Sequence, residues 1–211
     1  MRYASIDLET TGLNPKVHNI VEFGAVLDDT MHPEVDVSLL PRFHAYVLPP
    51  YDQEEYTGHP FALAMHPAIF KCIANRTPPF RYLRAEDLGL EFSAFLFQNG
   101  IDLSKPEDPR VRRPALTAGG KNFGTFDLRF LRECPGFLDA VPFRHRVIDP
   151  CLAAFIPSDE VLPETKLCAA RLGVVTGADA HTAIEDAMLV TRMIRAAIQR
   201  LTPMAAISHA A

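Results

Sequence analysis

The order of strand-like and helical segments is the feature that most constrains how this chain can fold. The first third contains short apolar runs rich in Val, Ile, Phe and Tyr, which predict three strands over 3–8, 20–27 and 35–47. Turn residues such as Gly12 separate the runs and favour an antiparallel meander. Helical patterns then alternate with short strand-like segments at 115–118 and 147–148. This order predicts an α/β domain with a mixed sheet.

Helices are expected between and after these strands. Two have local end signals: Gly173 follows one helix as a C-terminal capping glycine, and Thr182 and Glu185 have the spacing of a capping box at the start of the last helix. The predicted helices cover 61–75, 86–98, a segment through Phe126 and Leu131, 164–172, and a last helix that starts near 182.

Composition narrows the class of protein. The 211 residues, with a formal net charge of -5, suit one globular domain that needs no disulfide or metal to stabilise its core. No apolar run approaches a membrane span and no signal-peptide core precedes Asp7, so a cytoplasmic protein is expected. The cysteines are too widely spaced for paired metal or redox motifs and are expected to be buried free thiols: Cys72, Cys134, Cys151 and Cys168.

Two carboxylates in the first strand are the first candidate for chemistry. Strand alternation places Asp7 and Glu9 on one face, with Ile6 and Leu8 on the other. Close like charges repel, and a hard divalent cation such as Mg²⁺ or Mn²⁺ commonly neutralises them. Taken alone, the pair fits a solvent-facing acidic strand equally well.

Two later segments carry further candidates. Asp127 falls in the first turn of a helix, where the helix dipole favours a carboxylate with or without a function. The neighbouring Gly119-Gly120-Lys121 is not a phosphate-binding loop, because the pattern needs Gly at 115 and Ser or Thr at 122. His181 just precedes the last helix and Asp186 lies in its first turn, so the histidine could act as a general base.

The chain carries Asp7-x-Glu9, then Asp127, then His181 with four residues between it and Asp186, and in this order it resembles the DEDDh branch of the 3′-to-5′ exonucleases. That family includes proofreading exonuclease subunits, ribonuclease T and oligoribonuclease. The resemblance extends to Glu22-Phe23-Gly24-Ala25 in the second strand. A tyrosine-type site would have Tyr where this chain has Thr182, so the histidine branch is preferred.

The resemblance implies a ribonuclease H-like fold, in which three antiparallel strands are followed by two parallel ones and helices flank the sheet. It implies catalytic roles for Asp7, Glu9, Asp127, His181 and Asp186. The four carboxylates would bind two divalent cations, Mg²⁺ or Mn²⁺, and His181 would take a proton from the attacking water. The product would be a nucleoside 5′-monophosphate released from a single-stranded 3′ end. The residues that would line the terminal nucleotide are Thr10, Thr11, Leu13 and Phe126.

The sequence departs from the family pattern in two places. Lys121 stands where many relatives have histidine. The second departure is a helical and loop region at about 49–114, which varies within the family. The whole chain, 1–211, is expected to form one exonuclease domain. Because loops over a fixed site select the substrate, preference for DNA or RNA stays open. Hydrolysis of short oligoribonucleotides or another small phosphodiester is one alternative, and a noncatalytic nucleic-acid-binding or interaction module is another. Some relatives form dimers, but this sequence indicates neither a homodimer nor a polymerase partner.

The charge is unevenly distributed along the chain. Residues 1–109 carry 8 basic and 16 acidic side chains, 110–146 carry 8 and 3, and 147–211 carry 5 and 7. The middle segment surrounds Asp127, where a strand entering the site could meet positive charge. An acidic total therefore suits an enzyme that holds a few terminal nucleotides, and it predicts weak binding to long duplexes.

Overall fold

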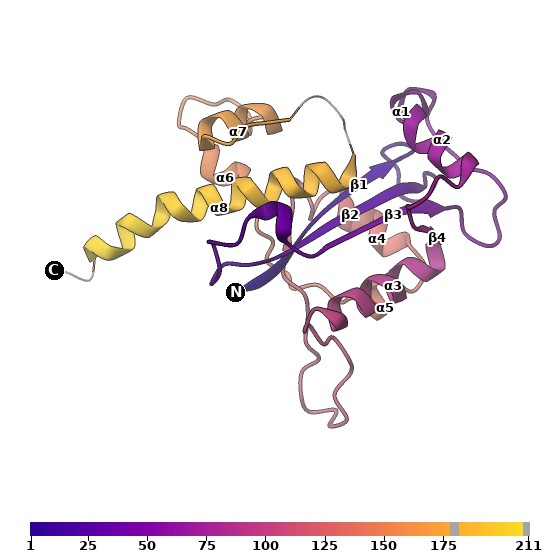
Figure 1. The fold of residues 1–211 in the computed structure, drawn as a ribbon, viewed down its shortest axis with the longest axis horizontal. Helices are drawn as coiled ribbons and strands as arrows, with labels where there is room; N and C mark the ends of the chain where they lie inside the picture. The colour runs from indigo at the N-terminus through magenta and orange to yellow at the C-terminus, as the bar shows by residue number, and fades with distance from the viewer. Residues whose placement is uncertain (178–181, 209–211) are drawn as a thin grey trace.

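A mixed five-stranded sheet forms the centre of the molecule (Figure 1). The computed structural model describes residues 1–177 and 182–208, with side chains up to 200. The strands lie in the order β4-β3-β2-β1-β5. Their bounds are β1 (Arg2–Thr10), β2 (Ile20–Asp29), β3 (Arg42–Leu48), β4 (Tyr82–Arg84) and β5 (Ala118–Gly119). The first three form the expected antiparallel meander, while β5 is parallel to β1 and β4 is parallel to β3. The α/β prediction is confirmed.

The parallel strands differ in detail from the expectation. The strand predicted at 147–148 is reduced to one bridge between Gly119 and Ile148, and β5 itself spans two residues. Pro150 follows this segment closely and has no N–H to continue a ladder. The short edge strand β4 was not predicted, because three residues carry too little alternation to be recognised.

Helices flank the sheet, and their ends follow local signals where these exist. They are α1 (Pro60–Met65), α2 (Pro67–Asn75), α3 (Ala85–Gln98), α4 (Asp127–Glu133), α5 (Phe137–Ala140), α6 (Cys151–Ala154), α7 (Thr165–Leu172) and α8 (Ala183–Ser208), with a 3₁₀ turn η1 at Val37–Leu39. Gly173 caps α7 in the left-handed conformation, as predicted. The single helix predicted at 61–75 was wrong, because Pro67 ends α1 and starts α2. No described helix has both the length and the apolar character needed to cross a membrane.

The two faces of the sheet bury different helices. Ala4, Ile6 and Leu8 of β1 pack into the main core with α3, α4 and α5. Tyr3, on the other face, packs with α6, α7 and α8. The alternation read from the sequence therefore holds, and Asp7 and Glu9 lie on the face that α8 crosses.

An irregularity in the pairing of β1 with β2 changes which side chains face outward near the end of β1. Glu9 pairs with Glu22, whereas Thr10 pairs with Ile20, so Val21 is an extra residue in β2. Val21 consequently packs with Ile69 of α2, on the face opposite the main core. The bulge thus gives α2 a place to pack beside the carboxylates.

A buried ion pair fixes α8 farther along the sheet. The Asp28 carboxylate accepts hydrogen bonds from Arg195 Nη2 at 2.6 Å, Arg195 Nε at 3.0 Å and the Tyr3 hydroxyl at 2.7 Å. Burial alone would raise the pKa of Asp28, but the hydrogen bonds and the charge of Arg195 outweigh it and lower that pKa. The folded protein therefore favours the ionised form of Asp28, which makes stability depend on pH.

Acid should remove this contribution. Because the pKa of Asp28 is lower in the folded than in the unfolded state, its stabilisation is present above the unfolded value of about 4 and is lost as pH falls through the folded value. Urea unfolding at pH 7, 5, 4 and 3 should find Asp28→Asn less stable than the wild type at pH 7, with a difference that shrinks below pH 4. A difference that stays constant down to pH 3 would contradict the assignment.

Candidate metal centre

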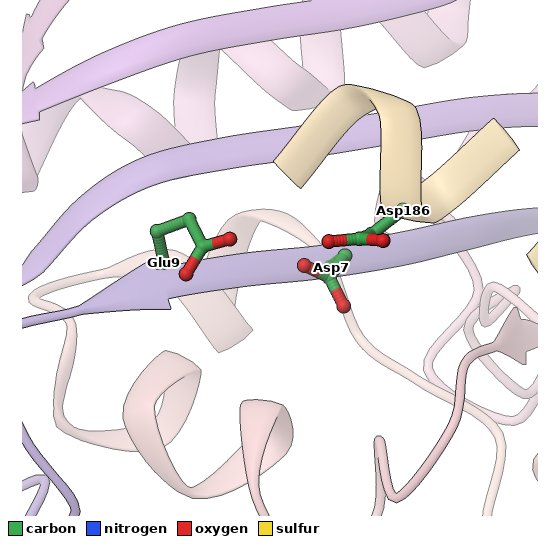
Figure 2. A group of neighbouring side chains, drawn as sticks. All are labelled: Asp7, Glu9 and Asp186. Carbon is green, nitrogen blue, oxygen red and sulfur yellow. The ribbon is translucent and has the colours of Figure 1, made fainter. Parts of the chain in front are cut away.

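Three carboxylates converge where β1 meets the start of α8. Asp7 and Glu9 extend from β1 and Asp186 from the first turn of α8, and ligand atoms of the three lie within 4.8 Å of one another (Figure 2). All three are partly buried. The structure therefore brings Asp186 of the last helix beside the two carboxylates of the strand motif, which lie 177 and 179 positions earlier in the sequence.

The start of α8 is held against β2 by two features of the second strand. Glu22 is fully buried, and its Oε2 accepts a hydrogen bond from the Ala183 N–H at 3.0 Å. Its other oxygen, Oε1, lies 2.6 Å from His44 Nε2. Gly24, which pairs with Asp7, leaves room for the helix, because a Cβ there would lie 2.3 Å from the Ala183 carbonyl carbon. Together, Glu22 and Gly24 position Asp186 over β1.

Asp127 lies beside this group but its carboxylate has another partner. It is the first residue of α4, it is 3% exposed, and its Oδ1 accepts a hydrogen bond from the Leu8 N–H at 3.1 Å. Since β5 pairs with β1 only at Ala4 and Ser5, no residue of β5 bonds the Leu8 N–H, and the Asp127 carboxylate accepts its hydrogen bond instead. Asp127 therefore caps an open part of the β1 edge and brings a fourth carboxyl group close to Asp7.

Crowding and burial change the acidity of these groups. Burial raises the pKa of Asp7 well above its ordinary value, and the charges of Asp127, Glu9, Asp186 and Glu22 raise it further. Burial also raises the pKa of Glu9 to about 8, with the charges of Glu22, Asp186 and Asp127 adding to the effect. For Asp127 burial raises the pKa to about 7, against hydrogen bonds from its own N–H and that of Leu8.

Such a set of carboxyl groups fits a divalent cation. Mg²⁺ and Mn²⁺ prefer oxygen ligands, and a bound dication favours the charged form of each carboxylate that burial and repulsion disfavour. The donor set is all oxygen, with no thiolate among the three converging groups. The residues present therefore fit a hard divalent metal ion.

The fifth catalytic position of the resemblance, His181, lies outside the described residues. The helix that follows it starts as predicted: Glu185 N–H donates to Thr182 Oγ1 at 3.4 Å. The second half of the capping box differs, because the Glu185 carboxylate accepts from the Thr182 hydroxyl at 2.9 Å.

The four residues expected at the terminal nucleotide have different surroundings. Thr10 and Thr11 are buried; the Thr10 hydroxyl donates to Gly12 O within the turn, and the Thr11 hydroxyl donates to Thr57 O in the loop before α1. Leu13 is 78% exposed beyond that turn. Phe126 is half-buried and packs on Phe130, with 5.2 Å between the ring centroids. The side chains of Leu13 and Phe126 are thus the more accessible of the four.

Several arginines of the basic segment 110–146 already have partners in the fold. Arg113 donates to the carbonyl oxygens of Leu103, Asp139 and Ala140. Arg110 pairs with Asp108 at 2.9 Å. Arg129 and Arg132, on α4, are exposed. Arg110 and Arg113 are therefore less available to bind a nucleic acid than the sequence count indicates.

Two side chains beside the centre, Glu22 and His66, had no role in the prediction from sequence. Glu22 belongs to a motif that the resemblance includes, but its contact with Ala183 depends on the pairing of β2 with β1 and on the packing of α8. His66 lies in the variable region, and its Nε2 is 3.5 Å from Glu9 Oε2. In the sequence, Pro67 after this histidine signals a break between two helices, but nothing there signals that His66 lies beside a functional site.

No protein-family model matches the chain, and no curated protein matches it by sequence. Solved structures do match. The nuclease domain of 3′hExo, described as a DEDDh family member bound to rAMP, superposes with a TM-score of 0.66 at 16% identity, over 94% of this chain and 92% of that one.

Two further structures match over almost the whole of this chain. A 3′-exonuclease that recognises the 3′ end of a histone mRNA stem-loop gives a TM-score of 0.61 at 15% identity, over 94% of this chain and 64% of that chain. E. coli exonuclease I in complex with a dT13 oligonucleotide gives 0.57 at 15% identity, over 96% of this chain and 42% of that one, so this chain spans less than half of that enzyme. The fold is that of the DEDDh exonuclease domains.

Proposed function

We propose that this chain is a DEDDh-type, metal-dependent 3′-to-5′ exonuclease that releases nucleoside 5′-monophosphates from single-stranded nucleic acid. The observation that carries the proposal is the convergence of Asp7, Glu9 and Asp186, with Asp127 beside them, on this fold. The four carboxylates occur in the order and spacing of the family motif. Chance surface acids would not be expected to be half-buried against one another at a cost in desolvation.

The roles of the residues follow from their places. Asp7, Glu9, Asp127 and Asp186 would hold two divalent cations, Mg²⁺ or Mn²⁺, which when bound supply a water of lowered pKa and Lewis-acid stabilisation of the scissile phosphate. His181 is the proposed general base that accepts the proton of the attacking water. Leu13 and Phe126 would contact the terminal nucleotide, and Thr10 and Thr11 would shape the turn that presents Leu13.

The chemistry of the substrate is supported at the level of a nucleic acid 3′ end. Among the structural neighbours, one is bound to rAMP, one to a DNA oligonucleotide, and one recognises an RNA stem-loop. Both sugars are therefore represented on this fold, and we propose a single-stranded 3′ end without choosing between them.

The decisive assay uses 5′-labelled single-stranded DNA and RNA of 2 to 30 nucleotides with Mg²⁺ or Mn²⁺. We expect a ladder that shortens from the 3′ end, release of 5′-monophosphates, and complete inhibition by a chelator. An oligomer with a 3′-phosphate serves as a control, because a blocked end should slow the first cleavage. If folded protein releases no mononucleotide from any member of the panel, the proposal is wrong.

The length series also separates the closest alternative. Since Arg110 and Arg113 of 110–146 already bind within the protein, we propose no long basic track, and this favours an enzyme for which a few nucleotides suffice. Rates confined to dimers through pentamers would identify an oligoribonuclease-like enzyme. Binding without turnover would instead identify a noncatalytic module.

A further inference from the structure

His66 brings the variable region of the chain into contact with the metal centre. The residue lies between α1 and α2, and its side chain is 6% exposed. Its Nε2 lies 3.5 Å from Oε2 of Glu9, whose side chain is 15% exposed. His66 comes from the region 49–114, outside the residues on which the resemblance rests.

The helix junction that carries His66 is anchored from two sides. On the α1 side, the His59 N–H donates to Thr11 O at 2.7 Å, which ties the segment to the turn after β1. On the α2 side, Ile69 is buried against Val21, the extra residue of the β2 bulge. The Phe70 N–H also donates to the carbonyl oxygen of His66 at 3.1 Å, which fixes the backbone of the histidine itself. The backbone that carries the imidazole is therefore held in place on both sides.

Glu9 is surrounded by other carboxylates, so a hydrogen-bonding partner would stabilise its position among them. Its own strand contributes Asp7, α8 contributes Asp186 and β2 contributes Glu22, all carboxylates. Against these carboxylates, the described structure places the imidazole Nε2 of His66 at 3.5 Å from Glu9 Oε2. The contact involves one oxygen of the carboxylate, and Figure 2 shows the Glu9 group directed toward Asp7 and Asp186. A contact on Oε2 can thus orient the group for a ligand on its other side.

We infer that His66 is a positioning residue that orients Glu9 in the metal centre, and that the α1–α2 segment thereby sets the geometry of the site. The inference rests on the proposed function, because it requires Glu9 to bind a divalent ion. Partners of this kind, one contact away from a metal, typically change metal affinity or activity tenfold to a hundredfold when they are removed. Its basis is the location of the side chain and does not depend on its protonation.

Mn²⁺ titration of His66→Ala, His66→Gln and the wild type, by calorimetry at one pH, tests this role without any nuclease assay. We expect His66→Ala to bind Mn²⁺ about tenfold or more weakly. His66→Gln should recover most of the affinity, because its amide can reach the same carboxylate oxygen. Lys71→Ala, an exposed change on α2, should bind as the wild type does. The ratio kcat/KM on a single-stranded oligomer should follow the same order.

The outcomes separate the two proposals. Equal Mn²⁺ affinity in the wild type and His66→Ala would overturn the role of His66 and leave the proposed function intact. Wild-type protein that binds no Mn²⁺ would overturn the metal centre itself. If His66→Ala does not fold, a folded His66→Asn variant takes its place, and Mn²⁺ affinity equal to that of the wild type would overturn the inference.

Discussion

Asp7→Asn should reduce the rate of mononucleotide release by at least about a thousandfold. Asp7 is at the centre of the proposed metal site, since the charges of four other carboxylates raise its pKa: Asp127, Glu9, Asp186 and Glu22. Metal ions contribute several kcal/mol to the stabilisation of such a transition state, and about 4 kcal/mol corresponds to a factor of about a thousand in rate. The measurement is single-turnover release from a labelled oligomer at saturating Mg²⁺.

The same substitution should leave the fold intact. Asp7→Asn removes one charge from a buried cluster of like charges, so the metal-free protein should melt at the same temperature as the wild type or higher. Asp52→Asn, an exposed change of equal charge, is the control and should retain full activity. An Asp7→Asn protein with normal turnover would refute the assignment of this residue as a metal ligand.

Gly24→Ala is expected to lower activity about a hundredfold without altering any charged group. Its Cβ would lie 2.3 Å from the carbonyl carbon and 2.4 Å from the carbonyl oxygen of Ala183, so the start of α8 must move. A displacement of about 1 Å at a catalytic group can cost a hundredfold in rate. Crowding of this kind also lowers the free energy of unfolding by about 1–3 kcal/mol.

Rate, Mn²⁺ affinity and urea unfolding should therefore all change in the Gly24→Ala protein. Gly177→Ala is the matched control, because a Cβ at that position meets no atom of the described residues within 4 Å. Loss of stability with wild-type metal affinity and rate would show that α8 can shift without moving Asp186, and would refute the positioning role of Gly24.

Local signals in the sequence were sufficient for much of the fold. The alternation of Ile6, Asp7, Leu8 and Glu9 predicted which side chains enter the core, since period two is a property of every strand. Gly173 ended its helix for an equally local reason, the low cost of a left-handed glycine. The predictions failed where the decisive partners are distant in sequence or the element is short. The three-residue strand β4 and the isolated bridge between Gly119 and Ile148 are too short for a sequence pattern to reveal.

The site divides in the same way. The family pattern in the sequence picked out Asp7, Glu9, Asp127 and Asp186, and the structure brings these residues into one region. The contacts of Glu22 with Ala183 and of His66 with Glu9 join residues 161 and 57 positions apart. Such contacts arise from strand register and helix packing, so no spacing rule could have predicted them. The assignment of His181 stays a prediction.

The two attachments of α8 to β2 have a practical consequence for studying this protein. Ala183 is bound by Glu22 and Arg195 by Asp28, and these residues of one helix are separated by about 18 Å at 1.5 Å of rise per residue. Two points at this distance fix both the tilt and the rotation of a rigid rod. Toward the C-terminus the helix extends past the sheet (Figure 1). A spectroscopic label or a fused reporter domain joined at that end should therefore leave the carboxylates undisturbed, which makes it the preferred place to immobilise the protein for single-molecule measurements.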